Sequence, residues 1–197
     1  MTESSAYVRQ LPIGVPLPLP DTGVQEWDVF PYEGDIRVRA LQPPTLPEPP
    51  RNGEHGPEGC VPCSYADADC LWTDDHWRLV DEHGAMPAIV KLLPRGHHDL
   101  ADLPAERSAE LGPMIQRVER ALLSLGGIAR VHVNRWGDGG AHLHLFFFAR
   151  PEGMLQFRGS CLPLWDEALP KVDGDLWAAN RGAVAKAMAQ DGGTAHV

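Results

Sequence analysis

The sequence contains no long apolar run. No stretch of its 197 residues approaches the ~18 consecutive apolar residues that a membrane-spanning helix needs. Residues 1–10 also lack the basic and then apolar layout of a secretory signal peptide. We therefore expect a cytoplasmic protein without a membrane partner.

Basic residues are scarce. The chain has 17 Lys and Arg against 27 Asp and Glu, which gives a formal net charge of −10 at pH 7. Proteins that bind DNA or RNA as polymers neutralise phosphates with a basic surface. The charge balance therefore argues against a nucleic acid polymer as partner. It leaves room for one phosphorylated small molecule, since a few local basic and backbone N–H groups can hold one phosphate.

Aromatic residues make up only 7% of the chain, whereas it has 20 Gly and 19 Pro. This composition predicts many turns and long connections rather than a helical bundle. Cysteine occurs four times, which in a cytosolic chain of this size does not indicate a disulfide framework. Cys60 and Cys63 have the CxxC spacing, which points first to metal or redox chemistry.

The N-terminal part is rich in proline. Residues 1–20 end in VPLPLP, which predicts an extended arm, and one domain is expected over 21–197 with its core in 58–170. Within 27–41, Ile36 and Val38 alternate with arginines, which predicts a hairpin or a pair of edge strands. Residues 42–59 are expected to form a long loop that leads to the CxxC.

Four further strands are expected at 71–80, 86–93, 128–136 and 141–150. The last two are joined by a glycine turn at 137–140, whose glycines permit the positive φ of a tight hairpin.

Two helices are expected among these strands. The apolar positions 111, 115, 118, 122 and 125 predict a helix over 104–125 that Pro113 kinks or delays and that Gly126 and Gly127 end. A C-terminal helix over 174–190 is expected to pack through Leu176, Ala179, Ala183 and Ala187. With about six strands and two helices in mixed order, the predicted fold class is α+β.

Two histidines lie two residues apart in the predicted strand 141–150. Strand periodicity places His142 and His144 on one face, about 7 Å apart, with Phe146 and Phe148. Neutral imidazole can bind a metal or act as a nucleophile or base near pH 7. The same pattern is equally typical of core histidines bonded to backbone carbonyls.

The CxxC makes a metal site the favoured interpretation. Two thiolates at this spacing, with His142 and a histidine at 97 or 98, form a Cys2His2 set typical of structural zinc. The alternatives are buried thiols or a redox pair. A redox pair usually lies at a helix N-terminus in a βαβ unit, which the predicted antiparallel order does not supply.

Taken in order, these motifs resemble the histidine triad (HIT) superfamily of nucleotide hydrolases and transferases. The similarity runs from Cys60 to Pro151, roughly half of the chain. It consists of the CxxC, a Trp-containing strand, Leu-Pro-Arg-Gly-His before a long helix, an Asn before a glycine turn, the His-x-His strand and Ala-Arg-Pro. The resemblance implies a HIT-like half-barrel of antiparallel strands with a long central helix, and it makes a homodimer an expected partner arrangement.

The resemblance also implies a role for each motif. His144 would be the nucleophile that attacks an α-phosphate to give a nucleotidyl-histidine, and Asn134 would contact ribose or phosphate. Gly139 and Gly140 would let their backbone N–H groups approach a phosphate, although the turn is equally typical of a plain hairpin. The implied ligands of a structural zinc are Cys60, Cys63, His97 and His142, with His98 as the alternative to His97.

One position departs from the family pattern. The third histidine of the triad is Phe146 here, and a phenyl ring is neither donor nor acceptor. Losing a charge-stabilising donor at such a transition state costs roughly 10²–10³ in rate by analogy with an oxyanion hole. Phe146 is therefore expected to form an apolar wall of the ligand site.

Cationic and aromatic side chains near the motifs have two interpretations each. The nearest positive charges are Arg95, Arg135 and Arg150; any of them could offset a phosphate, with Arg150 a predicted substrate-binding residue, although such arginines are more often solvated. Tryptophans at 72, 77 and 136 either stack on a base or fill the core, and we expect two of them in the core.

Three functions follow from these residues. The first is a zinc-stabilised HIT-like nucleotide phosphohydrolase or nucleotidyl transferase that acts through His144. The second is a HIT-like module that binds a nucleotide or another metabolite and has lost phosphoryl chemistry. The third is a catalytic metal with an open coordination position and His144 as its base.

Overall fold

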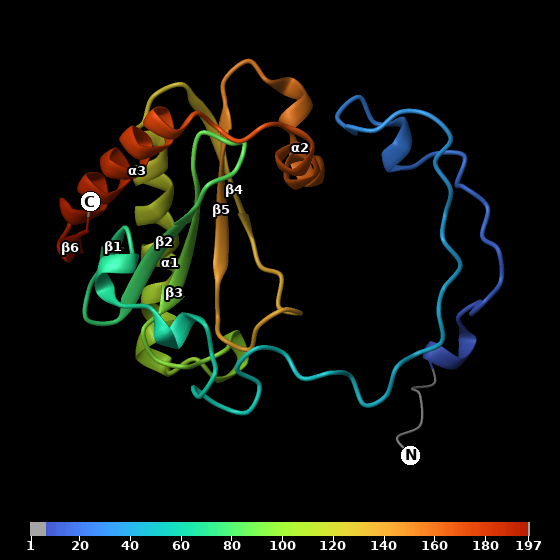
Figure 1. Cartoon of the computed structure of the whole chain (residues 1–197), viewed down its shortest axis with the longest axis horizontal. Helices are drawn as coiled ribbons and strands as arrows, with labels where there is room; N and C mark the ends of the chain where they lie inside the picture. The colour runs from blue at the N-terminus through green and yellow to red at the C-terminus, as the bar shows by residue number, and fades with distance from the viewer. Residues whose placement is uncertain (1–6, 197) are drawn as a thin grey trace.

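A computed structural model describes residues 7–196 and shows one open antiparallel sheet with three α-helices (Figure 1). Residues 1–6 of the predicted arm and Val197 lie outside the described residues. The strand order across the sheet is β4-β5-β3-β2-β1-β6. The strands are β1 Trp72–Thr73, β2 Trp77–Glu82, β3 Ile89–Pro94, β4 Ile128–Asn134, β5 Leu145–Pro151 and β6 Thr194–Ala195, and the helices are α1 Ala105–Leu123, α2 Leu162–Ala168 and α3 Gly174–Ala189. The predicted α+β fold class is confirmed.

Helices α1 and α3 cover one face of the sheet and form the main core with it. The residues of β5 alternate: Leu145, Phe147 and Ala149 face this core. Phe147 is fully buried. Burying a ring of this size stabilises a fold by about 1.5–3 kcal/mol, so β5 anchors both the core and the opposite face, which carries the functional side chains.

Helix α1 follows the predicted apolar stripe. Met114, Val118 and Leu122 are buried against the sheet, and the glycines at 126 and 127 follow the helix with positive φ. Pro113 lies inside the helix and does not delay its start, which comes at Ala105. The predicted later start is therefore wrong: the eight residues 105–112 before Pro113 are already helical, because the apolar stripe on both sides of Pro113 packs on the sheet.

Helix α3 occupies the predicted range but presents another face. Val184, Ala185 and Met188 are buried, whereas Leu176 is 54% exposed and the alanines at 179 and 183 are exposed. Of the predicted stripe, Ala187 does pack against the core, but Leu176, Ala179 and Ala183 do not. Larger apolar side chains one position further along the helix occupy the core in their place. Burial of Val184 and Met188 removes more apolar surface from water than burial of alanines does.

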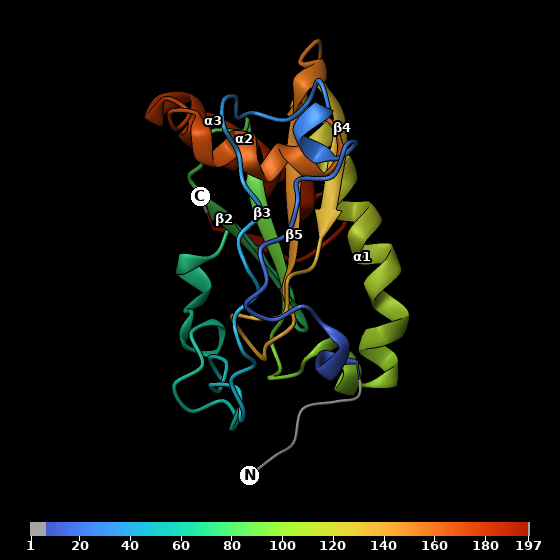
Figure 2. The ribbon, with the colours of Figure 1, turned by 90° about the vertical axis from the view of Figure 1, so that its right-hand side faces the viewer.

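The second face of the sheet carries two smaller apolar clusters. One contains Met86, Ile89, Phe148 and Leu162 and is covered by α2; the other contains Cys70, Val80 and Leu93 with Tyr65 packed against them. Between the two clusters the sheet is not covered by a helix. This is the face that Figure 2 shows toward the viewer.

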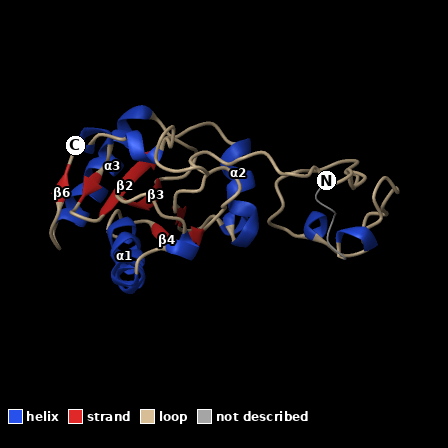
Figure 3. Cartoon of the chain, turned by 90° about the horizontal axis from the view of Figure 1, so that it is seen from below, coloured by secondary structure: helices blue, strands red, loops and turns tan. Residues whose placement is uncertain are grey.

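The segment 7–50 runs as a strap outside this second face, with two short 3₁₀ turns at Val8–Gln10 and Val24–Glu26 (Figures 2 and 3). Trp165 of α2 donates a hydrogen bond from Nε1 to the carbonyl oxygen of Val29 at 2.8 Å. The predicted hairpin over 27–41 is wrong. Ile36 and Val38 are exposed, and the described residues offer their alternating pattern no neighbouring strand to form a ladder.

The sequence also missed details of the sheet. Residues 71–80 divide into β1 and β2 around a turn in which Asp74 Oδ1 accepts the N–H groups of His76 and Trp77. The short C-terminal strand β6 pairs with β1. Strand β5 begins at Leu145 rather than at the predicted residue 141, so His142 and His144 lie in the connection that precedes the strand.

No helix within residues 7–196 has the length and apolarity to cross a membrane. The predicted division into an arm over 1–20 and a single domain over 21–197 stays a proposal.

Candidate metal centre and ligand cavity

Four side chains meet beside the sheet. The ligand atoms of Cys60, Cys63, His97 and His142 all lie within 4.8 Å of one another. Cys63 Sγ lies 3.3 Å from His97 Nδ1 and 3.5 Å from His142 Nδ1, and Cys60 Sγ lies 3.6 Å from His142 Nδ1. In a tetrahedral zinc site the sulfur and nitrogen ligands are separated by about 3.5 Å. The cluster therefore has the dimensions of a Cys2His2 zinc site.

The histidine nitrogens that face away from the cluster bond to backbone carbonyls. His97 Nε2 lies 3.1 Å from the carbonyl oxygen of Gly53, and His142 Nε2 lies 2.9 Å from that of Pro94. Since a carbonyl only accepts, each Nε2 carries the proton and each Nδ1 keeps a lone pair toward the cluster. This arrangement fits the requirements of a metal ligand.

Burial sets the protonation of the ligands. It raises the pKa of the Cys63 thiol to about 11, with the neighbouring Cys60 adding to the effect, and it lowers the pKa of His142. A neutral His142 can bind a metal at pH 7 without losing a proton, whereas Cys63 must release one. Metal binding at this cluster is therefore coupled to proton release.

The loop before the CxxC fits closely around the cluster. Gly53 has φ +76°, and a Cβ there would lie 2.9 Å from His97 Cε1 and 3.1 Å from Cys60 Sγ. Only glycine fits this position without moving a ligand. Of the two neighbouring histidines, His97 joins the cluster, while His98 accepts the N–H of Leu143 at its carbonyl oxygen at 2.7 Å.

A cavity of about 280 Å³ lies on the second face of the sheet, between its two apolar clusters. Its volume is near the ~300 Å³ lower end of small-ligand pockets. Strands β3 and β5, the CxxC loop and the glycine turn supply its walls. The lining residues are Asn52, Val61, Pro62, Tyr65, Lys91, Leu93, Gly139, Gly140, His142, His144 and Phe146.

His144 is held in one orientation at this cavity. Its Nδ1 lies 2.8 Å from the carbonyl oxygen of His142, so Nδ1 donates and Nε2 keeps its lone pair. Leu143 points to the core on the opposite side, as the predicted alternation requires. His142, His144 and Phe146 consequently all line the cavity although β5 begins after His144.

The glycine turn differs from the expected tight hairpin. Gly137, Gly139 and Gly140 are not among the described glycines with positive φ, and the connection from β4 to β5 spans residues 135–144. Gly139 and Gly140 do line the cavity as predicted. A Cβ on Gly140 would lie 3.9 Å from His144 Cε1, an ordinary contact. The prediction that these glycines serve a positive φ is therefore wrong.

Two predicted substrate-binding residues lie outside the cavity lining. Asn134 ends β4 and is paired across the sheet with Phe146. Arg150 lies at the opposite end of β5, is buried, and donates to the carbonyl oxygens of Pro151 and Met154, both at 3.3 Å. The strand length separates Arg150 from His144 by six residues, so the structure does not bring it to the site.

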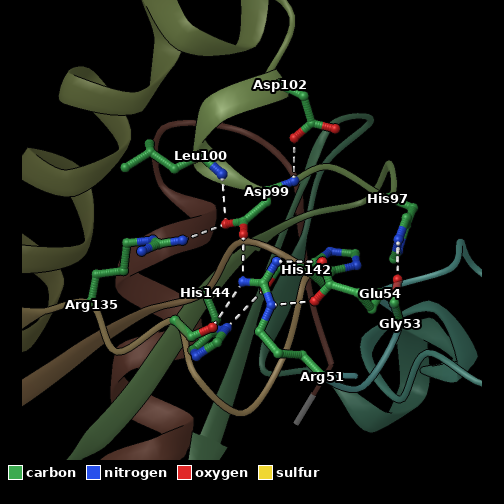
Figure 4. A network of polar contacts seen from close by, with 11 residues as sticks. Arg51, Gly53, Glu54, His97, Asp99, Leu100, Asp102, Arg135, His142 and His144 are labelled. Atoms are coloured by element: carbon green, nitrogen blue, oxygen red, sulfur yellow. Dashed lines mark hydrogen bonds and ion pairs between the residues drawn. The ribbon is translucent and has the colours of Figure 1, made fainter. Parts of the chain in front are cut away.

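The other two arginines that the sequence singled out, Arg95 and Arg135, are engaged in ion pairs, as is Arg51. Arg51 and Arg135 both bond to Asp99 near the N-terminal end of α1, at 2.9 and 2.5 Å (Figure 4). Burial alone would raise the pKa of Asp99, but hydrogen bonds from Arg135, the Leu100 N–H and Arg51 outweigh it and lower that pKa. Arg95 pairs with Asp67 at 2.8 Å.

Sequence reasoning missed six of the residues that line the cavity, among them Asn52 and Lys91. Asn52 bonds to both the CxxC loop and the glycine turn, and Lys91 lines the cavity next to Phe146. Asn52 stands in a proline-rich stretch that carries no periodic signal. Lys91 had a signal, because it is the one charged residue in the apolar run 86–93.

The tryptophans divide as expected. Trp72 and Trp77 are buried in the core. Trp136 is 45% exposed and contacts Phe146 edge-on, with ring centroids 5.3 Å apart.

Comparisons with known proteins agree with this geometry at the level of the fold. The sequence matches no family model and no curated protein. A histidine triad protein from Bradyrhizobium japonicum superposes with a TM-score of 0.51 at 21% identity, over 60% of this chain and 89% of the other. A zinc-bound histidine triad family protein from Mycobacterium smegmatis gives 0.49 at 21% identity, over 68% and 96%. One from Marinobacter aquaeolei gives 0.49 at 21% identity, over 62% and 91%. The superposition on the Bradyrhizobium japonicum protein shows that the chain has a HIT-like α+β fold.

Proposed function

On the basis of this HIT-like fold and the cavity at His144, we propose that the protein is a nucleotide phosphohydrolase or nucleotidyl transferase. The observation that carries the proposal is the hydrogen bond from His144 Nδ1 to the carbonyl oxygen of His142 at 2.8 Å. In the neutral ring it puts the proton on Nδ1 and the lone pair on Nε2, which is the tautomer that a nucleophilic Nε2 requires.

The reaction proceeds in two steps. His144 Nε2 forms a bond to the α-phosphorus of a nucleotide, and the bond from that phosphorus to the leaving group breaks with its electron pair. A proton from solvent completes the leaving group. Water or another acceptor then attacks the phosphorus of the nucleotidyl-histidine and gives up its proton to solvent. The phosphorus–nitrogen bond breaks, and its electron pair returns to Nε2 of the free imidazole.

The backbone N–H groups of Gly139 and Gly140 are proposed to approach the phosphate, and the Phe146 ring is proposed to hold the apolar part of the ligand. Both roles are supported by the position of these residues in the cavity lining. Asn134, directly opposite Phe146 in the β4–β5 ladder, stays a proposed contact of ribose or phosphate, whereas Arg150 at the far end of β5 is left out of the proposed site.

We propose zinc at Cys60, Cys63, His97 and His142. The sulfur and nitrogen spacings and the protonated outer nitrogens support it. Four protein ligands close a tetrahedral coordination sphere, which makes the role structural and argues against a catalytic metal. The ion would hold the CxxC loop to His142 and so fix the residue whose carbonyl orients His144.

The test is incubation with dinucleoside polyphosphates and nucleoside phosphoramidates, followed by acid-free quenching and intact-mass detection of a nucleotidyl adduct. Turnover and the adduct are expected in the unmodified protein and in His76→Ala, which alters an exposed histidine. Both are expected to disappear in His144→Ala. Equal turnover in His144→Ala would overturn the proposal.

A second function is favoured by Phe146 itself. This ring, with Trp136 and Phe148 beside it, forms a largely apolar aromatic wall, and the Phe146 ring has no hydrogen-bond donor where the triad has its third histidine. Such a wall suits a protein that binds a nucleotide without cleaving it. Ligand-induced thermal stabilisation with intact ligand after long incubation would favour this function.

A cytoplasmic location and a homodimer also stay predictions. Strand β4 is one edge of the sheet, and Val133 on it is 41% exposed. The molar mass from light scattering tests the dimer.

A further inference from the structure

Lys91 stands where the sheet face would otherwise be apolar. Side chains of β3 alternate, so that Val90 and Leu92 enter the main core while Ile89 and Leu93 belong to the two clusters of the second face. Lys91 lies between Ile89 and Leu93 on that face and lines the cavity. An apolar side chain there would join the two clusters, so packing alone does not account for a lysine.

The contacts of Lys91 place its charge at Phe146. The two residues are directly opposite each other in the β3–β5 ladder, and Lys91 Nζ lies 5.3 Å from the centroid of the phenyl ring. The His144 ring lies 5.6 Å from the same ring, edge-on. Lys91 and His144 therefore flank one aromatic side chain in one cavity.

The structural partner of Lys91 is weak. Glu82 Oε2 lies 3.2 Å from Nζ, but the Glu82 side chain is 53% exposed. Exposed pairs of this kind contribute about 0–1 kcal/mol to stability. A ligand phosphate can therefore compete with Glu82 for the ammonium group.

Among the residues described as lining the cavity, Lys91 is the one Lys or Arg, and none is Asp or Glu. Arg51, Arg95 and Arg135 are held by carboxylates elsewhere. The net charge of −10 repels an anion overall, so a phosphate in this cavity needs a cation close at hand.

We propose that Lys91 binds the phosphate of the ligand and supplies, from the neighbouring strand, the charge that Phe146 does not. The inference rests on the proposed function, in which the ligand is a nucleoside carrying a phosphate. It assigns the phosphate to the Lys91 side of the Phe146 ring and the apolar part of the ligand to the aromatic surface formed with Trp136.

The experiment is calorimetric titration with AMP, adenosine and inorganic phosphate. The unmodified protein is expected to bind AMP more tightly than adenosine, and Lys91→Met is expected to weaken AMP binding by about 10- to 100-fold, the usual contribution of a charge-assisted hydrogen bond. Lys91→Arg is expected to recover part of the affinity. Lys186→Met removes the same charge from an exposed position of α3 and is expected to have no effect.

Two further measurements separate binding from folding. AMP affinity is expected to fall with added salt in the unmodified protein and to change little with salt in Lys91→Met. Glu82→Gln releases Lys91 from its competitor and is expected to strengthen AMP binding about 2- to 3-fold, within the range of an exposed ion pair.

Equal affinity of Lys91→Met and the unmodified protein for AMP would overturn the inference, as would an unmodified protein that binds neither AMP nor phosphate. Lys91-dependent AMP binding without a nucleotidyl adduct on His144 would uphold the inference and refute the proposed chemistry. Formation of the nucleotidyl adduct at an unchanged level in Lys91→Met would uphold the proposed chemistry and refute the role of Lys91.

Discussion

The side-chain oxygen of Asn52 accepts a hydrogen bond from the backbone N–H of Val61 at 2.9 Å. The side-chain amide of Asn52 also donates to the carbonyl oxygen of Gly59 at 2.8 Å, and its backbone carbonyl accepts the N–H of Ala141 at 2.9 Å. One residue thus joins the CxxC loop to the segment that carries His142. The metal centre and the cavity share this wall.

Replacement of Asn52 by alanine is expected to loosen the CxxC loop. Two side-chain hydrogen bonds near the surface contribute about 1 kcal/mol together, so the melting temperature should fall by about 2–4 °C. Asn52→Asp keeps the acceptor for Val61 and loses the donor to Gly59. Its melting temperature should lie between those of the unmodified protein and Asn52→Ala. Thermal unfolding measures the series, and an unchanged melting temperature in Asn52→Ala would contradict this role.

Zinc content is expected to depend on His97 and not on its neighbour. Purified protein that has not met a chelator should contain about one equivalent of zinc, and His97→Ala should contain less than about half an equivalent, because a ligand is lost from the Cys2His2 set. His98→Ala is the matched control and should keep the metal. Elemental analysis decides the matter, and equal zinc loss in both variants would count against the assignment.

Zinc affinity is expected to rise with pH. Burial raises the pKa of Cys63 to about 11, so below that pH zinc must displace the thiol proton on binding. This proton alone makes the affinity increase about tenfold per pH unit between pH 6 and 8. Burial lowers the pKa of His142, which reduces the share of protons that this ligand releases on metal binding. Competition with a coloured chelator measures the slope, and a flat profile would rule out thiolate ligation.

The sequence predicted correctly those helices and strands in which the apolar residues define a single buried face. The stripe of α1 identified Val118 and Leu122 because a long amphipathic helix has only one apolar face. In α3 the same argument failed, because small alanines occur all around the helix and Val184 with Met188 decided which face is buried. Alternation at Ile36 and Val38 also misled, since a strand needs a partner that local sequence does not specify.

The sequence predicted those residues of the site that belong to a recognisable motif. The CxxC and the His-x-His pattern identified Cys60, Cys63 and His142 as residues that lie together. The choice between His97 and His98 depends on which imidazole reaches Gly53, a contact between distant loops. Cross-strand neighbours such as Lys91 and Phe146 depend on the β3–β5 register, which a single sequence does not define.

Phe146→His is expected to raise the rate of nucleotidyl transfer to His144. The Phe146 ring lies 5.6 Å from the His144 ring and lines the cavity, so an imidazole there can donate to a phosphate oxygen or to the leaving group. A donor placed this way accelerates such a step by about 10²-fold. Phe146→Leu removes the aromatic contact to Lys91 without adding a donor and serves as control. Single-turnover formation of the adduct is the measurement. A histidine variant no faster than the leucine variant would show that the cavity holds the phosphate away from position 146, and Lys91 would then be the nearer cation.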